Sequence, residues 1–445
     1  MKNRRYAKDL YIGVVPITIE NGKVCVEGSG DPIDYAVKMH RFSDDALLSH
    51  RIDAGLLTTN EVHELATTVA RFHATAQRCD KEPAQRVPML LIANVKETID
   101  TLEKGAAGEI ASSLSVLRRW TDRYYDEHRT DFAARSENGF IRECHGDLHL
   151  QNIVLWNGKL VPFDGIEFND DFRWIDVMND AAFLAMDLAA RGRLDLSRSF
   201  TNGYLETTGD YASLVVLRWY LVYRALIRAM VAKMKADHHQ DDAKLNRADV
   251  NDFRDHVNLA YRFTLTDAPT LYITYGLSGS GKTTASEIVV ARRGAIRLRS
   301  DVERKRHFGV SDDDPIDITL RRKMHCESAN IATYNRLMQL ASGTLRAGYP
   351  VVIDATFLKL ADRTRFHQFA ESEGVPFAIL DCHADVQTLR QRIADRIAKG
   401  NDASDADFAV LDLQLKTQEL LTSQERAFVV NMSDLVTTVD HLTNS

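Results

Sequence analysis

One segment limits the possible folds of this chain more than any other. Residues 276–283 read Gly-Leu-Ser-Gly-Ser-Gly-Lys-Thr and match the pattern GxxxxGK[ST] in full. The apolar run TLYITY (270–275) precedes the segment, and a helical pattern follows it. Glycines let backbone N–H groups turn inward around a phosphate, and the N-terminus of the next helix favours the anion. The segment therefore predicts a phosphate-binding loop between a buried strand and a helix.

We expect this loop to bind the phosphates of ATP. Lys282 is predicted to reach the β- and γ-phosphates, and the hydroxyl of Thr283 to hold Mg²⁺. The predicted nucleotide-binding residues of the loop are Gly276, Ser278, Gly279, Ser280, Gly281, Lys282, Thr283 and Thr284.

Two further apolar runs, VVID (351–354) and FAIL (377–380), are typical of buried parallel strands, and helical patterns separate them. This alternation predicts an α/β domain with a doubly wound parallel sheet. Asp354 ends the first run, which is the usual place for a carboxylate that acts on Mg²⁺ or its waters. A strand-end turn or a helix cap is the alternative role.

Two groups of polar residues could complete a site around the loop. Asp301 could take a proton from an acceptor hydroxyl, and Arg304 could orient the acceptor. Helix capping by Ser300 or Asp301 is the alternative. Arg392 and Arg396 are four residues apart and share a helix face, so both could close over ATP and stabilise the transferring phosphoryl group. A solvated helix face would show the same spacing.

The motifs GLSGSGKTT, SDVER, VVIDATF and the RxxxR helix together resemble the P-loop small-molecule and polynucleotide kinases, a group that includes zeta-toxin-like kinases. The resemblance covers the chain from about Thr270 onward. It implies that Asp301 is a general base and Arg304 an acceptor-site residue. It does not identify the acceptor.

The length of 445 residues exceeds what a single hydrophobic core supports. We expect one domain over residues 1–265 and the P-loop domain over residues 266–445. Residues 10–42 read as short strands with a hairpin turn at Asn21-Gly22, and the chain is mainly helical from there to about residue 262. Thr59 or Asn60 is expected to cap the helix NEVHELATTVARFHATA.

A second candidate site lies in this N-terminal part. HGDLHLQN (145–152) precedes the apolar strand IVLW, and the next strand, LVPFDGIEF, contains Asp164. Phosphoryl transfer can use a carboxylate at the acceptor hydroxyl, an Asn on the same loop that binds Mg²⁺, and a second Asp that bridges Mg²⁺ to the phosphates. The spacing predicts these roles for Asp147, Asn152 and Asp164.

The pieces ARFHA (70–74), HGDLHLQN, PFDGIEF (162–168) and WIDVMNDAAF (174–183) resemble the aminoglycoside phosphotransferase family, which shares the protein-kinase-like fold. The resemblance implies a catalytic role for Asp147 and metal ligation by Asn152 and Asp164. It implies structural roles for His145, Asp176 and Asp180. The domain order resembles bacterial fusions of such a domain with a P-loop ATPase or kinase.

One part of that resemblance is incomplete. Lys38 in YAVKM looks like the lysine of a kinase-like fold, but in this family the helix ending in ARFHA follows the hinge strand. This order places Lys38 on the hinge strand, so the lysine and glutamate pair of the N-terminal lobe is not visible in the sequence: either the start is truncated, or this domain has lost its own ATP clamp. A catalytic role for Lys38 is the alternative.

Composition narrows the partners. The net charge of −7 argues against a general nucleic-acid-binding surface. No apolar run reaches the length of a membrane span, and MKNRRYAKDL lacks the apolar core of a signal peptide. The five cysteines are scattered without a CxxC pair, which suits a reducing compartment. We expect a cytoplasmic protein without membrane partners; its oligomeric state is left open.

These features predict an ATP- and Mg²⁺-dependent phosphotransferase that moves the γ-phosphate to a hydroxyl of a small-molecule acceptor. Its working site would lie in the P-loop domain, with the N-terminal domain as an accessory or second site. The alternative is an ATP-switched regulatory module or a slow ATPase without an acceptor. Phosphorylation of aminoglycosides is disfavoured, because no acidic pocket for a cationic drug is identifiable in the sequence.

Overall fold

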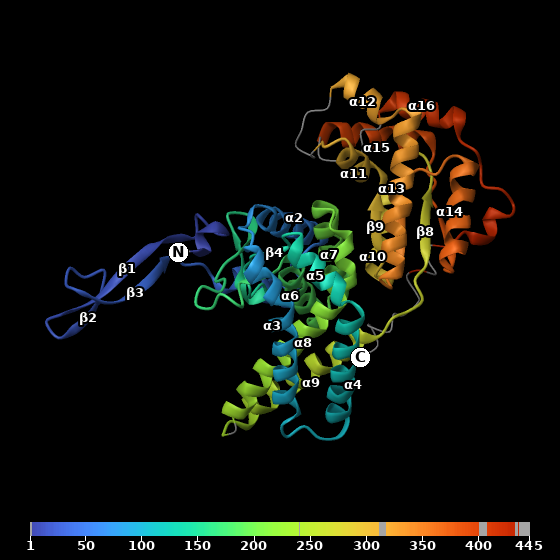
Figure 1. Ribbon diagram of the computed structural model, residues 1–445. Coiled ribbons are helices and arrows are strands. Elements are labelled where there is room, and N and C mark those ends of the chain that lie inside the picture. The colour runs from blue at the N-terminus through green and yellow to red at the C-terminus, as the bar shows by residue number, and fades with distance from the viewer. Residues whose placement is uncertain (1, 240, 311–316, 400–406, 432–434, 436–445) are drawn as a thin grey trace. The chain divides into compact units, whose positions relative to one another are not determined.

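The computed structural model describes residues 2–239, 241–310, 317–399, 407–431 and 435. The chain forms two compact units (Figure 1). The N-terminal unit contains Met1–Thr208 and Val216–Thr264, and the C-terminal unit contains Gly209–Val215 and Leu265–Ser445.

The N-terminal unit is mainly helical. Its helices are α1 (Leu48–Asp53), α2 (Thr59–Thr75), α3 (Lys81–Glu103), α4 (Gly108–Glu127), α5 (Arg129–Glu137), α6 (Val177–Ala190), α7 (Leu194–Thr208), α8 (Leu214–His238) and α9 (Ala243–Thr264). Its strands are β1 (Tyr11–Glu20), β2 (Lys23–Val26), β3 (Pro32–Met39), β4 (Ile141–Glu143), β5 (Ile153–Trp156), β6 (Lys159–Pro162) and β7 (Trp174–Asp176).

The first three strands form an antiparallel sheet in the order β2-β1-β3. Asn21 and Gly22 join β1 to β2 with φ values of 52° and 76°, so the predicted hairpin turn is confirmed. Several apolar side chains of this sheet are exposed to solvent; Val14 on β1 and Val24 on β2 are 52% and 69% exposed. In Figure 1 the sheet extends outward from the helices of its unit.

Lys38 lies on β3 of this sheet, and its Nζ is 2.8 Å from a carboxylate oxygen of Glu27. Both side chains are about half exposed, so the ion pair adds little to stability. This contact does not decide whether Lys38 acts in catalysis, and that alternative stays a prediction.

Helix α2 begins one residue earlier than we expected. Its cap is Thr58, whose side chain accepts from the backbone N–H of Glu61, while the Glu61 carboxylate accepts from the N–H of Thr58. The prediction of Thr59 or Asn60 was wrong, because only Thr58 has a glutamate three residues later and can form this reciprocal capping box.

Helix α6 is buried almost all round and forms the centre of the N-terminal unit. Its first turn is capped by Asp176, which accepts from the backbone N–H of Met178 at 2.8 Å. Helix α7 packs on α6 and also on α2. The segment between β4 and β5, which contains the predicted Asp147 loop, contacts α6 through the turn Leu150–Asn152.

The C-terminal unit is a parallel α/β structure. Its strands are β8 (Leu271–Tyr275), β9 (Ile296–Arg299), β10 (Val351–Asp354) and β11 (Phe377–Asp381), in the order β11-β8-β10-β9. Its helices are α10 (Lys282–Arg293), α11 (Ser300–His307), α12 (Ile318–Met324), α13 (Glu327–Arg346), α14 (Leu360–Glu373), α15 (Val386–Lys399) and α16 (Phe408–Thr417). All strand pairs are parallel, which confirms the predicted parallel sheet.

Alternate residues of β8, β10 and β11 face different sides of the sheet. Tyr272, Val352 and Leu380 pack with Val289 of α10 in one buried cluster. The intervening residues point to the other face, and α13 and α14 also contact the sheet. The carboxyl ends of the strands meet at one edge, which is where the predicted loop lies.

Among the residues that the structure describes, no helix combines the length and apolar character that crossing a membrane requires.

Candidate functional site

The predicted phosphate loop joins β8 to α10 and has glycine where the backbone needs it. Gly276, Gly279 and Gly281 have φ values of 151°, 83° and 97°. A Cβ atom on Gly276 would lie 2.3 Å from the carbonyl oxygen of Cys382, a distance that no side chain tolerates. The sequence pattern therefore reflects a close approach between this loop and the end of β11.

Lys282 begins α10 and points back along the loop. Its Nζ donates to the carbonyl oxygen of Leu277 at 2.7 Å. Burial lowers the pKa of Lys282, and the charges of Asp354 and Asp301 partly oppose that shift. A lysine under this influence gains from an anionic ligand, because the ligand would replace the lost hydration.

A cavity of about 1700 Å³ lies over this loop and contains nearly every predicted residue of the C-terminal unit. The predicted residues that line it are Ser278, Gly279, Ser280, Gly281, Lys282, Thr283, Thr284, Asp301, Arg304, Asp354, Arg392 and Arg396. Gly276 is outside this lining. The structure thus brings together residues from the ends of β8, β9 and β10 and from α15.

Asp354 lies at the carboxyl end of β10 and is 7% exposed. The hydroxyl of Ser286 donates to its Oδ2 at 3.3 Å. Asp354 and Thr283 offer oxygen atoms to the same cavity, and oxygen is the ligand type that Mg²⁺ prefers. The residues present therefore fit the predicted metal.

Arg304 is buried, and its position is fixed from two elements. Its Nη1 donates to the carbonyl oxygen of Met324 at 2.7 Å and to Oδ1 of Asn330 at 2.5 Å. Asp301 precedes it by three residues on α11, so both side chains share one helix face. This face borders the cavity, where Asp301 could reach an acceptor hydroxyl.

Two side chains from outside the loop hold its backbone. Arg392 of α15 donates through Nη1 to the carbonyl oxygen of Gly279 at 3.0 Å. Gln414 of α16 accepts from the backbone N–H of Ser278 at 2.9 Å. Sequence reasoning missed Gln414, because a lone glutamine in a helical segment has no distinguishing signal.

In the N-terminal unit, the structure brings Asp147 and Asn152 into contact. Nδ2 of Asn152 donates to Oδ2 of Asp147 at 2.9 Å, and Nε2 of His149 is 3.2 Å from the same oxygen. Burial by itself would raise the pKa of Asp147, but the hydrogen bond and charge of His149 outweigh it, so the pKa is lowered. Asp147 is therefore an ionised carboxylate with one edge open to solvent.

Asp164 follows β6, and sheet pairing brings it near Asn152. Ile153 pairs with Pro162, and the backbone N–H of Phe163 donates to the carbonyl oxygen of Asn152 at 2.9 Å. Asp164 has a left-handed φ of 60°, and its N–H donates to the hydroxyl of Tyr11 at 2.9 Å. The oxygen atoms of Asn152 and Asp164 suit a hard cation in kind; their predicted role as metal ligands stays a prediction.

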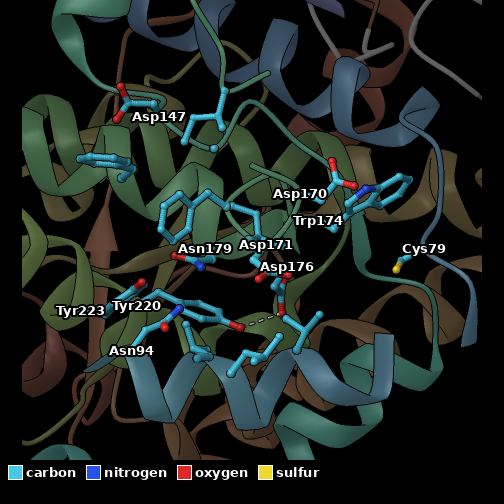
Figure 2. Close-up of a pocket in the computed structure, with 18 of the residues that line it drawn as sticks. Cys79, Asn94, Asp147, Asp170, Asp171, Trp174, Asp176, Asn179, Tyr220 and Tyr223 are labelled. Atoms are coloured by element: carbon cyan, nitrogen blue, oxygen red, sulfur yellow. Dashed lines mark hydrogen bonds between the residues drawn. The ribbon is translucent and has the colours of Figure 1, made fainter. Parts of the chain in front are cut away.

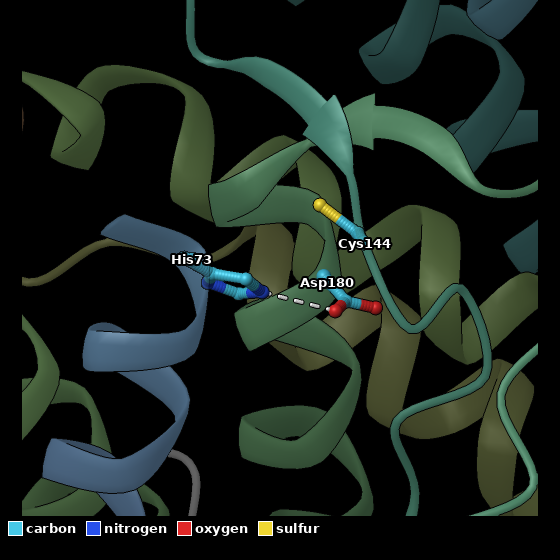
Figure 3. A group of neighbouring side chains, drawn as sticks. All are labelled: His73, Cys144 and Asp180. Atoms are coloured by element: carbon cyan, nitrogen blue, oxygen red, sulfur yellow. Dashed lines mark hydrogen bonds and ion pairs between the residues drawn. The ribbon is translucent and has the colours of Figure 1, made fainter. Parts of the chain in front are cut away.

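Asp180 of α6 holds the start of the Asp147 loop. Its Oδ2 accepts from the backbone N–H of His145 at 3.0 Å, and its Oδ1 accepts from that of Gly146 at 2.8 Å. Nε2 of His73 on α2 lies 3.0 Å from the same Oδ2 (Figure 3). Nδ1 of His73 contacts the hydroxyl of Tyr204 at 2.9 Å.

His73, Cys144 and Asp180 lie close enough together to bind one metal ion. Both ring nitrogens of His73 are already engaged, however, and Asp180 already accepts from two backbone N–H groups. We therefore interpret this cluster as a hydrogen-bonded support of the loop.

A second cavity, of about 680 Å³, lies in the N-terminal unit and opens beside Asp147 (Figure 2). Four further aspartates line it, although the sequence suggested no acidic pocket. Asp176 is neutralised by Arg135, whose Nε is 2.5 Å away, and Asp170 pairs with Arg173. The lining is therefore less acidic than its composition suggests.

The comparisons with known proteins cover different shares of this chain. Residues 271–421 match a family model described as an AAA domain. Uncharacterised proteins of Mycobacterium tuberculosis and Mycobacterium bovis are 28% identical over 408 residues, which is 90% of this chain and 78% of theirs.

Two solved structures are also similar in part. A gluconokinase from Sinorhizobium meliloti is 19% identical with a TM-score of 0.27, over 38% of this chain and 88% of its own. A sugar kinase from Janibacter is 18% identical with a TM-score of 0.28, over 38% of this chain and 91% of its own. Residues 271–421, which match the AAA-domain model, contain the phosphate loop and the four strands of the parallel α/β unit in this structure.

Proposed function

We propose that the chain is an ATP-dependent phosphotransferase that moves the γ-phosphate of ATP to a hydroxyl of a small-molecule acceptor, at the phosphate loop of the C-terminal unit. The observation that supports this most is the cavity in which Lys282, Asp354 and Asp301 meet. It combines a phosphate-binding cation, an oxygen ligand for a metal and a carboxylate that can accept a proton.

Each group has a separate task. The inward-facing loop and Lys282 would bind the β- and γ-phosphates, and the lysine charge would stabilise the negative charge of the transferring group. Asp301 would take the proton of the acceptor hydroxyl, and Arg304 would orient that acceptor from its fixed position. Arg392 and Arg396 would approach the phosphates from α15.

Thr283 and Asp354 would hold Mg²⁺, which supplies charge neutralisation between the β- and γ-phosphates when it is bound. A carboxylate and a hydroxyl at the strand ends are the oxygen donors that this role needs.

The N-terminal unit supports a second candidate role. Asp147 is ionised, contacts Asn152 and borders its own cavity. We propose that this unit is an accessory or second site, as its likeness to aminoglycoside phosphotransferases implies. The alternative is a regulatory module whose nucleotide site only switches the binding of a partner. Measurement of ATP turnover distinguishes this module from the phosphotransferase.

The test is ATP turnover by the wild type, Lys282→Ala and Asp147→Ala, with and without a fraction of small cytosolic metabolites. We expect the wild type to be stimulated by the metabolites. Lys282→Ala should lose about 100-fold or more of that turnover, since it removes a charge from the transferring phosphate. Asp147→Ala should retain most of it.

Retained turnover in Lys282→Ala would refute the assignment of the working site. Equal losses in both variants would show that the Asp147 loop also takes part in the reaction. Slow turnover that no metabolite stimulates would instead favour the nucleotide-switched module.

A further inference from the structure

We propose that the cavity of the N-terminal unit is a binding site for a small organic monocarboxylate with an apolar body, and that Arg224 of α8 binds its carboxylate. The site is separate from the phosphate loop, and it does not depend on the function proposed above.

Arg224 is the unusual residue of this cavity. It is 7% exposed and lines the cavity, yet it makes no ion pair with any carboxylate in the parts of the chain that the structure describes. Its Nε donates to Oδ1 of Asn179 at 2.8 Å, and its Nη1 donates to the carbonyl oxygen of Gly146 at 3.3 Å. Its guanidinium carbon lies 4.5 Å from the ring centre of Phe183.

These contacts use only part of the guanidinium. Arginine has five N–H donors, and the Nη2 pair makes no hydrogen bond within the described structure. No carboxylate of the described residues pairs directly with the guanidinium, although Asp147 and Asp180 lie near enough for their charges to interact with it, so a ligand carboxylate can form the direct contact that these groups do not make. A carboxylate suits the planar donor pair best, because both of its oxygens can accept at once.

The walls of the cavity indicate the rest of the ligand. Apolar side chains of α3 and α8 form much of the lining: Val87, Leu90, Leu91, Ile227 and Met230. The volume of about 680 Å³ lies within the usual range of about 300–1,000 Å³ for small-molecule sites. The body of the ligand is therefore apolar and of modest size.

The charges around Arg224 limit the ligand to one negative group. Asp147 follows Gly146, which Arg224 contacts, and Asp171 also lines the cavity. Both carboxylates would repel a second anionic group or a phosphate dianion. A hydroxyl on the ligand, in contrast, could donate to Asp147, so an apolar hydroxy acid fits all of these groups.

The test uses 3-phenyllactate as the probe and its uncharged amide as the matched ligand, with binding measured by titration calorimetry. We expect the wild type to bind the acid at least about tenfold more tightly than the amide, and Arg224→Gln to lose that preference. The control Arg191→Gln removes an exposed arginine of the same unit, which pairs with Asp53, and should bind like the wild type.

Arg224 also fixes the Asp147 loop, so folding of each variant is checked by tryptophan fluorescence. If Arg224→Gln does not fold, Ile227→Trp provides the second variant, because the larger ring fills the cavity and should abolish binding. Equal binding of acid and amide by the wild type would overturn the proposal. So would wild-type affinity in a folded Arg224→Gln or in Ile227→Trp, or no binding of the acid at millimolar concentration.

Discussion

Replacement of Asp180 by asparagine tests whether the Asp147 loop depends on its buried support. In the wild type the two carboxylate oxygens accept from the backbone N–H groups of His145 and Gly146 and contact Nε2 of His73. Asparagine has the same shape but only one acceptor oxygen. If that oxygen serves Gly146, the new NH₂ group faces the N–H of His145, and two donors point at each other.

The cost follows from these contacts. His73 can adapt by moving its proton to Nδ1, where the hydroxyl of Tyr204 can accept. The N–H of His145 cannot adapt, and it loses a hydrogen bond to a charged acceptor while it remains buried. Such a loss costs about 1.5–3 kcal/mol, and the opposed donors add to it. We expect a destabilisation of about 2–4 kcal/mol.

The assay can follow the N-terminal unit alone. The chain has four tryptophans, Trp120, Trp156, Trp174 and Trp219, and all of them lie in that unit. Urea unfolding monitored by tryptophan fluorescence should show a midpoint lowered by about 1 M or more. The matched control is Asp195→Asn, which removes an exposed ion pair with Arg193 and should change stability by less than about 1 kcal/mol.

The pH dependence provides a second check. Burial opposes ionisation of Asp180, but the hydrogen bond from His73 and nearby positive charges outweigh it, so the pKa is lowered below its ordinary value of 3.8. A lowered pKa contributes stability above pH 3.8, and this contribution is lost as the pH falls through the folded-state pKa. The difference in unfolding free energy between the wild type and Asp180→Asn should therefore become smaller in acid. A midpoint shift no larger than that of Asp195→Asn would refute the reasoning.

Two further predictions concern the phosphate loop. Since burial lowers the pKa of Lys282 below 10.5, its charge should be lost at a lower pH than in a free lysine. The affinity for ATP, measured by titration calorimetry, should fall as the pH rises toward 10. Lys282→Arg stays charged, so its ATP affinity should depend less on pH. Parallel pH profiles of the two proteins would contradict this prediction. Gly276→Ala should destabilise the C-terminal unit by about 1–3 kcal/mol and weaken ATP binding, because its Cβ would meet the carbonyl oxygen of Cys382. Gly343→Ala, where a Cβ meets nothing within 4 Å, is the control for thermal unfolding, and equal melting temperatures would count against the packing argument.

The parts of this structure that the sequence predicted are those with a local cause. TLYITY became β8, and the glycines after it adopt backbone angles that other residues avoid. Strand β9 was not anticipated, because IRLR is only four residues long and its arginines interrupt the continuous apolar run that marks a buried parallel strand. Its strand conformation follows from parallel pairing with β10, which is 55 residues further on in sequence at Val351 and Ile296.

The site shows the same division. Asp147, Asn152 and Asp164 belong to one short stretch, and its spacing was enough to group them. Arg224 belongs to a helix whose arginines look alike in sequence, and only the fold shows that this one is buried against Gly146. Sequence patterns identify residues that act together when they are neighbours in the chain, and tertiary packing decides the others.

The support of the Asp147 loop also has a consequence for the way the chain is made. Asp180 lies 35 residues after His145, which it contacts, and 107 after His73, while Arg224 lies 78 residues after Gly146. The loop therefore leaves the ribosome well before the groups that fix its shape. Fragments that end before α8 contain the HGDLHLQN motif together with His73 and Asp180 but lack Arg224, so their Asp147 loop should be less stable than in the full chain.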